Sequence, residues 1–256
     1  MKNEHGVSRR HLLQSAALGG ALSAMGLRPT AAAAAGEGEA VQLSEGDVVL
    51  IQGDSITDAG RSRRHQDSPN NTGALGRGYA QMIATRLLGD MPYKKLKVYN
   101  RGISGNKVPD LQSRWEADAL SLKPALLSIL IGVNDIWHKL GGRYDGTVDD
   151  YEKGFADLLA ETKQKLPEVK LVVCEPFVLR CGAVNDNWFP EFDQRRARAK
   201  NVAEQAGTIF VPFQAMFDEA VKHATPQYWA GDGVHPTLAG HALMAATWMN
   251  VVFGQG

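Results

Sequence analysis

Short apolar runs alternate along the chain with longer stretches in which apolar residues recur every three or four positions. The short runs predict buried strands at 47–52, 96–100, 125–131, 170–175 and 208–211. The longer stretches predict amphipathic helices at 79–88, 110–120, 148–166, 191–205 and 237–252. Strands that alternate with helices are typical of a parallel sheet covered on both faces, so the predicted fold class is α/β.

The N-terminal residues 1–35 predict an export signal rather than part of the fold. Arg9 and Arg10 precede an apolar stretch at 12–27, and small residues follow at 31–35. This order is typical of a twin-arginine signal peptide, which is removed. Polar residues and glycines interrupt the apolar stretch, so we predict no stable membrane anchor, although a retained N-terminal anchor is the alternative. The prediction is a single domain over 36–256, in a periplasmic or secreted protein.

The charge balance and the two cysteines limit the partners and the disulfides that can be expected. The chain has 28 basic and 28 acidic side chains and a formal net charge of zero, which gives no reason to expect a nucleic acid or an anionic membrane as partner. Cys174 lies inside an apolar run, which predicts a buried free thiol, and a disulfide with Cys181 is the alternative.

Five polar or small residues that suit acyl transfer follow predicted strands or occupy the last loop. Ser55, Gly105 and Asn134 come directly after the first three strands, and Asp232 and His235 precede the last helix. The carboxyl ends of parallel strands share one edge of a sheet, where ligands bind in open α/β folds. The order of these residues therefore predicts that they meet at one site.

His235 is the candidate general base, because an imidazole can accept a proton from a serine hydroxyl and return it near neutral pH. Asp232 lies three residues earlier in a tight loop, where its carboxylate can orient the ring. Ser55 is then the nucleophile. The structural alternatives are a helix cap or turn for Ser55, and an Asp-His pair that caps the last helix. His241 is predicted to be part of the scaffold.

Gly105 and Asn134 are candidate oxyanion-hole donors, together with the backbone N–H of Ser55. Glycine lets a backbone N–H approach a substrate oxygen without a Cβ in the way, and the asparagine amide offers a directed N–H. A strand-to-helix turn at Gly105 and an Asx turn at Asn134 are the structural alternatives.

These segments resemble the four sequence blocks of the SGNH (GDSL) hydrolase superfamily, in order and over the whole predicted domain. The matching segments are GDSITD at 53–58, GISGN at 102–106, GVND at 132–135 and DGVHP at 232–236. The resemblance implies a flavodoxin-like three-layer αβα sandwich with a five-stranded parallel sheet. It also implies the same roles for Ser55, Asp232, His235, Gly105 and Asn134.

A closer resemblance is to bacterial acetylxylan esterases of this superfamily, on the segments at 54–61, 75–79, 100–106 and 110–115. It implies a serine esterase that removes O-acetyl groups from xylan or xylo-oligosaccharide through an acyl-enzyme, with no metal or organic cofactor. The alternatives are another esterase of the superfamily, such as a lysophospholipase or thioesterase, and a non-catalytic glycan-binding protein.

Four side chains are candidate substrate contacts: Asp54, Arg61, Trp137 and Trp229. Tryptophans on a rim can stack on sugar rings, and packing within the scaffold is their alternative role. The polar, arginine-rich segment at 59–78 is predicted to form one wall of the cleft, with a solvated loop or a homo-oligomer contact as the alternative.

Four aspartates near the same edge raise the alternative of a Mg²⁺ or Mn²⁺ site for phosphoester chemistry: Asp54, Asp58, Asp135 and Asp232. That reading leaves Gly105, Asn134 and His235 without roles. We therefore predict no metal.

Overall fold

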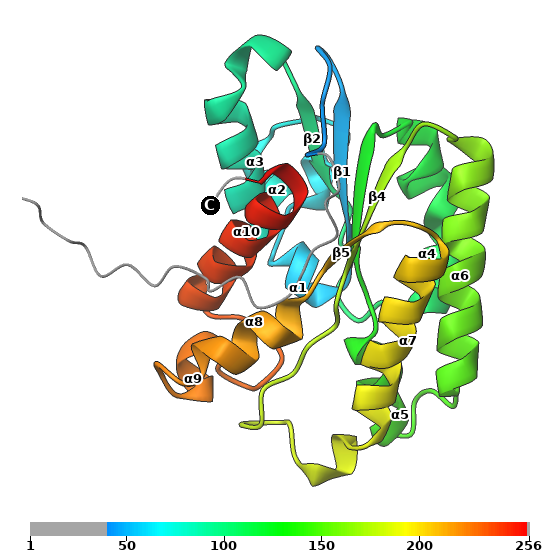
Figure 1. Ribbon diagram of the computed structural model, residues 1–256, viewed down its shortest axis with the longest axis vertical. Coiled ribbons are helices and arrows are strands. Elements are labelled where there is room, and N and C mark those ends of the chain that lie inside the picture. The colour runs from blue at the N-terminus through cyan, green and yellow to red at the C-terminus, as the bar shows by residue number, and fades with distance from the viewer. Residues whose placement is uncertain (1–39, 255–256) are drawn as a thin grey trace, which may run out of the picture. The chain divides into compact units, whose positions relative to one another are not determined.

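The computed structural model describes residues 40–254 (Figure 1). The predicted export signal at 1–35 lies outside the described residues. Within the described part, no helix combines the length and the apolar character that crossing a membrane requires.

Five strands form one parallel sheet. They are β1 (Val48–Gly53), β2 (Lys97–Asn100), β3 (Leu126–Leu130), β4 (Lys170–Cys174) and β5 (Ile209–Val211), in the spatial order β2-β1-β3-β4-β5. The register places Leu50 of β1 beside Tyr99 of β2 and Leu127 of β3. The predicted five-stranded parallel sheet is confirmed, and each predicted strand lies within a residue of its observed bounds.

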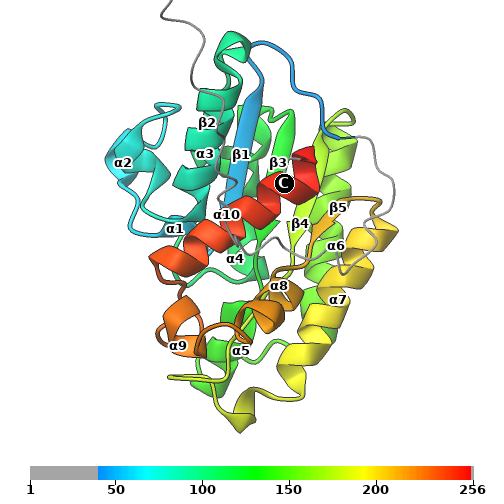
Figure 2. The same ribbon diagram turned by 60° about the vertical axis from the view of Figure 1, so that its left-hand side comes forward.

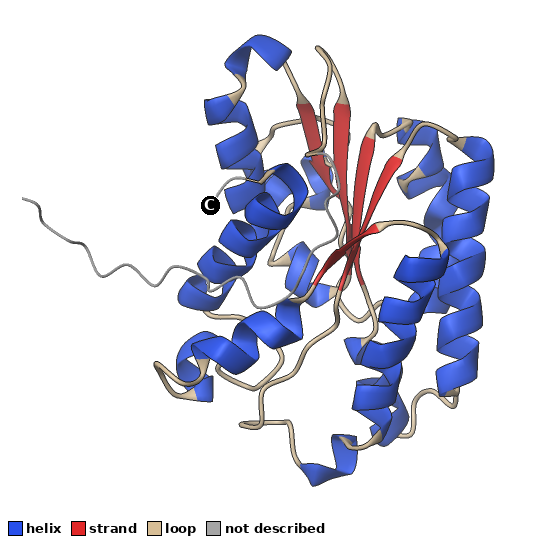
Figure 3. Ribbon diagram, viewed as in Figure 1, coloured by secondary structure: helices blue, strands red, loops and turns tan. Residues whose placement is uncertain are grey.

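Helices cover both faces of the sheet, as Figures 1 and 2 show. One face carries α3 (Tyr79–Asp90), α8 (Phe213–Ala220) and α10 (Leu238–Phe253), and the other carries α4 (Val108–Asp118), α6 (Val148–Lys165) and α7 (Glu191–Gln205). Successive side chains of β1 alternate between the two layers, so Val49 and Ile51 join one core cluster and Leu50 the other. The three-layer αβα prediction is confirmed (Figure 3).

Short helices complete the fold, and the sequence pattern did not predict them. They are α1 (Ser55–Asp58), α2 (Thr72–Leu75), α5 (Val133–Leu140) and α9 (Pro226–Trp229), and α8 was also missed. One or two turns are too short to show a 3.6-residue period. Both α1 and α5 lie at the carboxyl edge of the sheet, the lower edge in Figure 1.

The segment at 59–78 covers the outer edge of β2. Asn70 acts as a substitute strand, since its backbone N–H donates to Val98 O at 3.0 Å and its side chain bonds both Leu96 O and Val98 N–H at 2.8 Å. Pairing of this kind satisfies the open backbone groups of an edge strand. Asn70 thus has a structural role at this edge of the sheet.

Both cysteines are buried and unpaired, so the predicted free thiol at Cys174 is confirmed and the alternative disulfide with Cys181 is not formed. The Cys174 thiol lies 3.4 Å from the hydroxyl of Ser128, and burial raises its pKa to about 12. A thiol of this kind stays protonated and unreactive at neutral pH.

Candidate active site

Ser55 is the first residue of α1, directly after β1 ends. Asp54 caps this helix, because its Oδ1 accepts the backbone N–H of Ile56 at 3.0 Å. The cap fixes the direction in which the chain leaves the strand. Ser55 is therefore presented at the carboxyl edge of the sheet, with its side chain only partly buried.

Ser55, His235 and Asp232 form a continuous hydrogen-bonded chain. Ser55 Oγ lies 2.8 Å from His235 Nε2, and His235 Nδ1 lies 2.7 Å from Asp232 Oδ2. Because Nδ1–H donates to the carboxylate, Nε2 is left with a lone pair for the serine hydroxyl. Residues 180 positions apart in the sequence thus meet in the arrangement that a serine nucleophile needs.

The loop that carries Asp232 is held from within. Its Oδ1 accepts the backbone N–H of Val234 at 2.9 Å and of His235 at 2.7 Å. Burial by itself raises the pKa of Asp232, but the hydrogen bonds from His235 and Val234 lower it below its ordinary value. Asp232 is accordingly ionised at neutral pH and can stabilise a protonated His235.

A second loop, at 178–184, is hydrogen-bonded to the loop that carries Asp232. Leu179 N–H donates to Gly233 O at 2.7 Å, and Ala183 N–H donates to Asp232 O at 2.9 Å. Gly233 has a φ of +87°, and a Cβ there would lie 2.5 Å from Leu179 O. Only glycine allows the two loops to approach so closely.

The predicted oxyanion donors lie in two segments that touch each other. Asn134 Nδ2 donates to the backbone O of Asn106 at 3.1 Å, and Asn106 follows Gly105. This leaves the second amide hydrogen of Asn134 free for a ligand. Among the described residues, none accepts a hydrogen bond from the backbone N–H of Ser55 or Gly105. Three donors are therefore free to bind an oxyanion.

Helix α5 brings in one residue that the sequence analysis missed. Asn134, Trp137 and His138 share a face of α5, since they lie three and four residues apart. His138 Cε1 lies 3.7 Å from the position that a Cβ on Gly105 would take. The spacing from Asn134 could have identified His138 if the helix itself had been predicted.

Trp137 is the predicted substrate contact that lies beside the proposed base. Its ring centroid is 5.8 Å from that of His235 and 5.6 Å from that of Trp188. Trp188 is buried, and its indole N–H donates to Ala183 O at 3.1 Å. Trp188 thus braces Trp137, which keeps a partly exposed surface next to the His235 ring.

The other three predicted substrate contacts face the protein interior, which corrects the sequence analysis. Asp54 is 1% exposed and caps α1. Arg61 is 7% exposed and its Nε donates to Gly102 O at 2.6 Å. Trp229 is 9% exposed and its indole N–H donates to Ala220 O at 3.0 Å. These three side chains therefore offer a ligand little surface, and their polar atoms bond other parts of the protein.

The four aspartates of the alternative metal site are directed at different partners. Asp54 caps α1, Asp58 accepts from Ser104, Asp135 accepts the N–H of Val108, and Asp232 orients His235. Within residues 40–254, no group of three or more acidic, histidine or cysteine side chains is arranged to hold a metal ion.

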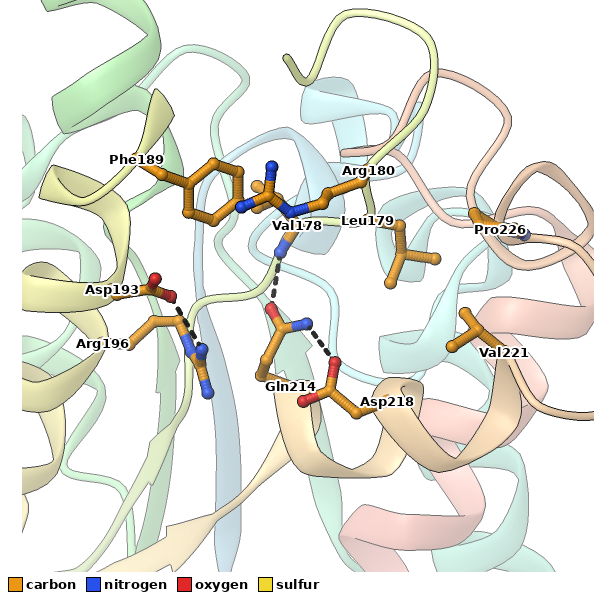
Figure 4. A pocket seen from close by; sticks show the side chains of 10 residues that line it. All are labelled: Val178, Leu179, Arg180, Phe189, Asp193, Arg196, Gln214, Asp218, Val221 and Pro226. Carbon is orange, nitrogen blue, oxygen red and sulfur yellow. Dashed lines mark hydrogen bonds and ion pairs between the residues drawn. The ribbon is translucent and has the colours of Figure 1, made fainter. Parts of the chain in front are cut away.

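A separate cavity of about 300 Å³ is lined by residues of α7, α8 and the 178–184 loop (Figure 4). Its polar groups satisfy one another. Gln214 accepts the N–H of Val178 at 2.9 Å and donates to Asp218 at 2.8 Å, while Arg196 donates to Asp193 at 3.0 Å. None of the Ser55, His235 or Asp232 side chains lines this cavity.

Comparisons with known proteins show the family to which the chain belongs. The model of the GDSL-like lipase/acylhydrolase family matches residues 51–243. An acetylxylan esterase from Geobacillus stearothermophilus is 36% identical over 217 residues, which span 83% of this chain and 96% of that protein.

Solved structures of similar proteins have names from the same family. A structure described as a putative GDSL-like lipase from Parabacteroides merdae is 49% identical with a TM-score of 0.82, over 85% of this chain and 100% of that chain. The acetylxylan esterase from Geobacillus stearothermophilus is 35% identical with a TM-score of 0.74, over 83% of this chain and 96% of that chain. The resemblance inferred from the motifs is confirmed.

Proposed function

We propose that this chain, which belongs to the GDSL-like lipase/acylhydrolase family and is a carboxylic ester hydrolase, removes O-acetyl groups from a carbohydrate such as xylan or xylo-oligosaccharide. The observation that carries the proposal is the hydrogen-bonded chain from Ser55 through His235 to Asp232. The name of the Geobacillus relative supports the acetylated glycan as substrate.

The geometry suggests a mechanism in two halves. Ser55 Oγ attacks the acetyl carbonyl carbon while its proton moves to His235 Nε2, and the oxyanion accepts hydrogen bonds from Gly105, Asn134 and Ser55 itself. His235 then gives the proton to the departing sugar oxygen, which leaves an acetyl group on Ser55. In the second half, His235 takes a proton from a water molecule whose oxygen attacks the acetyl carbon. His235 then returns this proton to Ser55 Oγ as the bond between the acetyl carbon and Oγ breaks, which releases acetate and restores the serine.

Two side chains support a sugar as the leaving group. Trp137 lies against His235, where the departing oxygen must receive its proton, and a partly exposed indole can stack on a sugar ring. His138 lies beside Gly105 on the other flank. Burial, with the nearby Lys107 and Arg143 cations, lowers the pKa of His138, so a neutral ring is available to hydrogen-bond sugar hydroxyls at neutral pH.

The test compares wild type, Ser55→Ala and Ser113→Ala on 4-nitrophenyl acetate, a long-chain 4-nitrophenyl ester and acetylated xylan, each with and without EDTA. Ser113 is an exposed serine on α4 whose hydroxyl donates to Asp110 O, so its loss is a matched control. We expect Ser55→Ala to lose about 10⁴-fold or more of kcat, and Ser113→Ala to keep it.

Each contrary result has a defined meaning. Activity that survives Ser55→Ala would refute the acyl-enzyme mechanism. Preference for the long-chain ester would point to a lysophospholipase or thioesterase, and sensitivity to EDTA would favour the metal alternative. Wild type that binds the glycan without cleaving any ester would be a binding protein.

We also infer that the chain is exported by the twin-arginine route. Arg9 and Arg10 stand before the apolar stretch at 12–27, outside the described residues. Replacing both arginines by lysine should hold esterase activity in the cytoplasmic fraction, whereas wild-type activity should appear in the periplasm or medium. Equal distribution of the two proteins would contradict export by this route.

A further inference from the structure

The last residue of α1 is joined to the turn that carries Gly105. We propose that Asp58 is a positioning residue that holds the Ser104–Gly105 turn in place as part of the oxyanion hole. The inference rests on the proposed function, because it assumes that the N–H of Gly105 binds the oxyanion. Within residues 40–254, the hydrogen bonds of the Asp58 side chain go to Ser104 and Arg61, and none goes to Ser55 or His235.

The contacts of Asp58 reach from the nucleophile helix to this turn. Its Oδ2 accepts the backbone N–H of Ser104 at 3.1 Å and the Ser104 hydroxyl at 3.2 Å. Its Oδ1 accepts the backbone N–H of Arg61 at 3.1 Å, just after α1 ends. The side chain is buried, so these hydrogen bonds are shielded from water. One carboxylate therefore fixes Ser104 relative to α1, whose first residue is Ser55.

The turn lies outside every helix and strand of the described residues, so hydrogen bonds to neighbouring segments hold its shape. Residues 101–107 connect β2 to α4, and Gly105 adopts a φ of +84°. Asn106 N–H closes the turn on Ile103 O at 3.1 Å, and the Arg114 Nε donates to Asn106 Oδ1 at 2.8 Å. Both neighbours of Gly105 are therefore held by side chains from other segments: Asp58 binds Ser104, and Arg114 binds Asn106. The peptide that joins Ser104 to Gly105 carries the proposed donor.

Hydrogen-bond donors and one cation stabilise the negative charge of the Asp58 carboxylate. Two donors from Ser104 and one from Arg61 bind it, and the Arg63 guanidinium lies 3.9 Å away. An amide in its place has one acceptor oxygen where the carboxylate has two. The side chain of asparagine can therefore accept from Ser104 or from Arg61, but not from both. The Arg61 N–H also donates to the backbone O of Asp58 at 2.9 Å, so an amide that keeps Ser104 places its NH2 group beside this N–H, and the two donors repel each other.

The experiment measures kcat and KM of Asp58→Asn on 4-nitrophenyl acetate, with Asp150→Asn as a matched control. Asp150 also accepts a backbone N–H and a hydroxyl from one residue, Thr147, at 2.9 Å and 2.7 Å, but at the start of α6. We expect kcat of Asp58→Asn to fall about 10–100-fold, because a misplaced donor stabilises the transition state less. KM should change less than about threefold, and Asp150→Asn should keep wild-type kcat.

A second readout separates positioning from a general loss of structure. A trifluoromethyl ketone forms a tetrahedral adduct with an active serine, so its inhibition constant should rise in Asp58→Asn by about the same factor as kcat/KM falls. Ser104→Ala removes the hydroxyl contact and keeps the backbone contact, so a smaller loss, about 3–10-fold in kcat, is expected. In the Asp58→Asn background, Ser104→Ala should add almost nothing.

Wild-type kcat in Asp58→Asn, or losses that simply multiply in the double variant, would overturn the inference. If Asp58→Asn does not fold, a folded Ser104→Ala with wild-type kcat and inhibition constant would overturn it instead. Activity remaining in Ser55→Ala would refute the proposed function, whereas an inactive Ser55→Ala beside a fully active Asp58→Asn would refute only the role of Asp58.

Discussion

The carboxyl group of Asp54 should make the stability of the protein depend on pH in an unusual direction. It is fully buried beneath Ser55, one oxygen caps α1, and the other has no hydrogen-bond partner within residues 40–254. Burial raises the pKa of Asp54 to about 7, and the neighbouring Asp135 carboxyl acts in the same direction, against the Ile56 N–H and His235. The folded protein therefore keeps this proton up to about neutral pH.

The size of the effect follows from the difference between the folded and unfolded states. An unfolded aspartate titrates at its ordinary value of 3.8, so from there to about pH 7 the folded state binds a proton that the unfolded chain has lost. The free energy of unfolding then decreases as pH rises through this range. At about 1.4 kcal/mol per pH unit, the decrease amounts to at most about 4 kcal/mol.

The substitution Asp54→Asn isolates the contribution of Asp54 to the pH dependence of the free energy of unfolding. Asparagine is also a good N-cap and does not ionise. The variant should match wild type near pH 4 and exceed its stability at pH 8, by up to about 4 kcal/mol. Asp135, whose pKa burial raises to about 6, adds a decline of the same sign in both proteins.

The assay is urea unfolding followed by tryptophan fluorescence at pH 4, 5, 6, 7 and 8. Asp157→Asn is the control, because that side chain is 54% exposed on α6, and its curve should parallel wild type. KM of Asp54→Asn should also stay near wild type, since the side chain is buried. Parallel pH profiles for wild type and Asp54→Asn would refute the reasoning, and a tenfold rise in KM would restore Asp54 as a substrate contact.

Three further predictions concern the site and its support. Asp232→Asn should lower kcat about 10³–10⁴-fold in a folded protein, because a neutral amide cannot stabilise a protonated His235; steady-state kinetics that show less than a tenfold loss would contradict this. Trp137→Ala should raise KM for an acetylated xylo-oligosaccharide about tenfold and that for 4-nitrophenyl acetate less than threefold, and equal changes would argue against stacking. Burial, with the nearby His235, lowers the pKa of His241 to about 4, and His241 Nδ1 accepts the backbone N–H of Tyr79. Because the unfolded chain binds a proton at His241 between pH 6.5 and 4 and the folded protein does not, the free energy of unfolding should fall as pH drops through this range. In thermal unfolding over this pH range, His241→Gln should lose less stability than wild type. If the two proteins lose equal stability, His241 is not the cause of the loss.

The strands and long helices could be predicted because their signals are local. A buried parallel strand such as β3 reads as a run of apolar residues, and an amphipathic helix such as α6 repeats its apolar face over several turns. The position of Ser55, Gly105 and Asn134 after successive strands then places them on one edge, since parallel strands end together. The motifs also led to the family that the comparisons confirm.

The sequence did not show which side chains are exposed beside the candidate catalytic residues. Asp54, Arg61 and Trp229 stand as close to the motifs as Trp137 does, yet only Trp137 keeps an exposed surface beside His235. Nor did it show α5, whose two turns place His138 beside Gly105, or the contact of Asp58 with Ser104. Periodicity and motif order are properties of neighbouring residues along the chain. Burial and pairing across the sheet edge depend on how separate loops pack in space, so only the tertiary structure decides them.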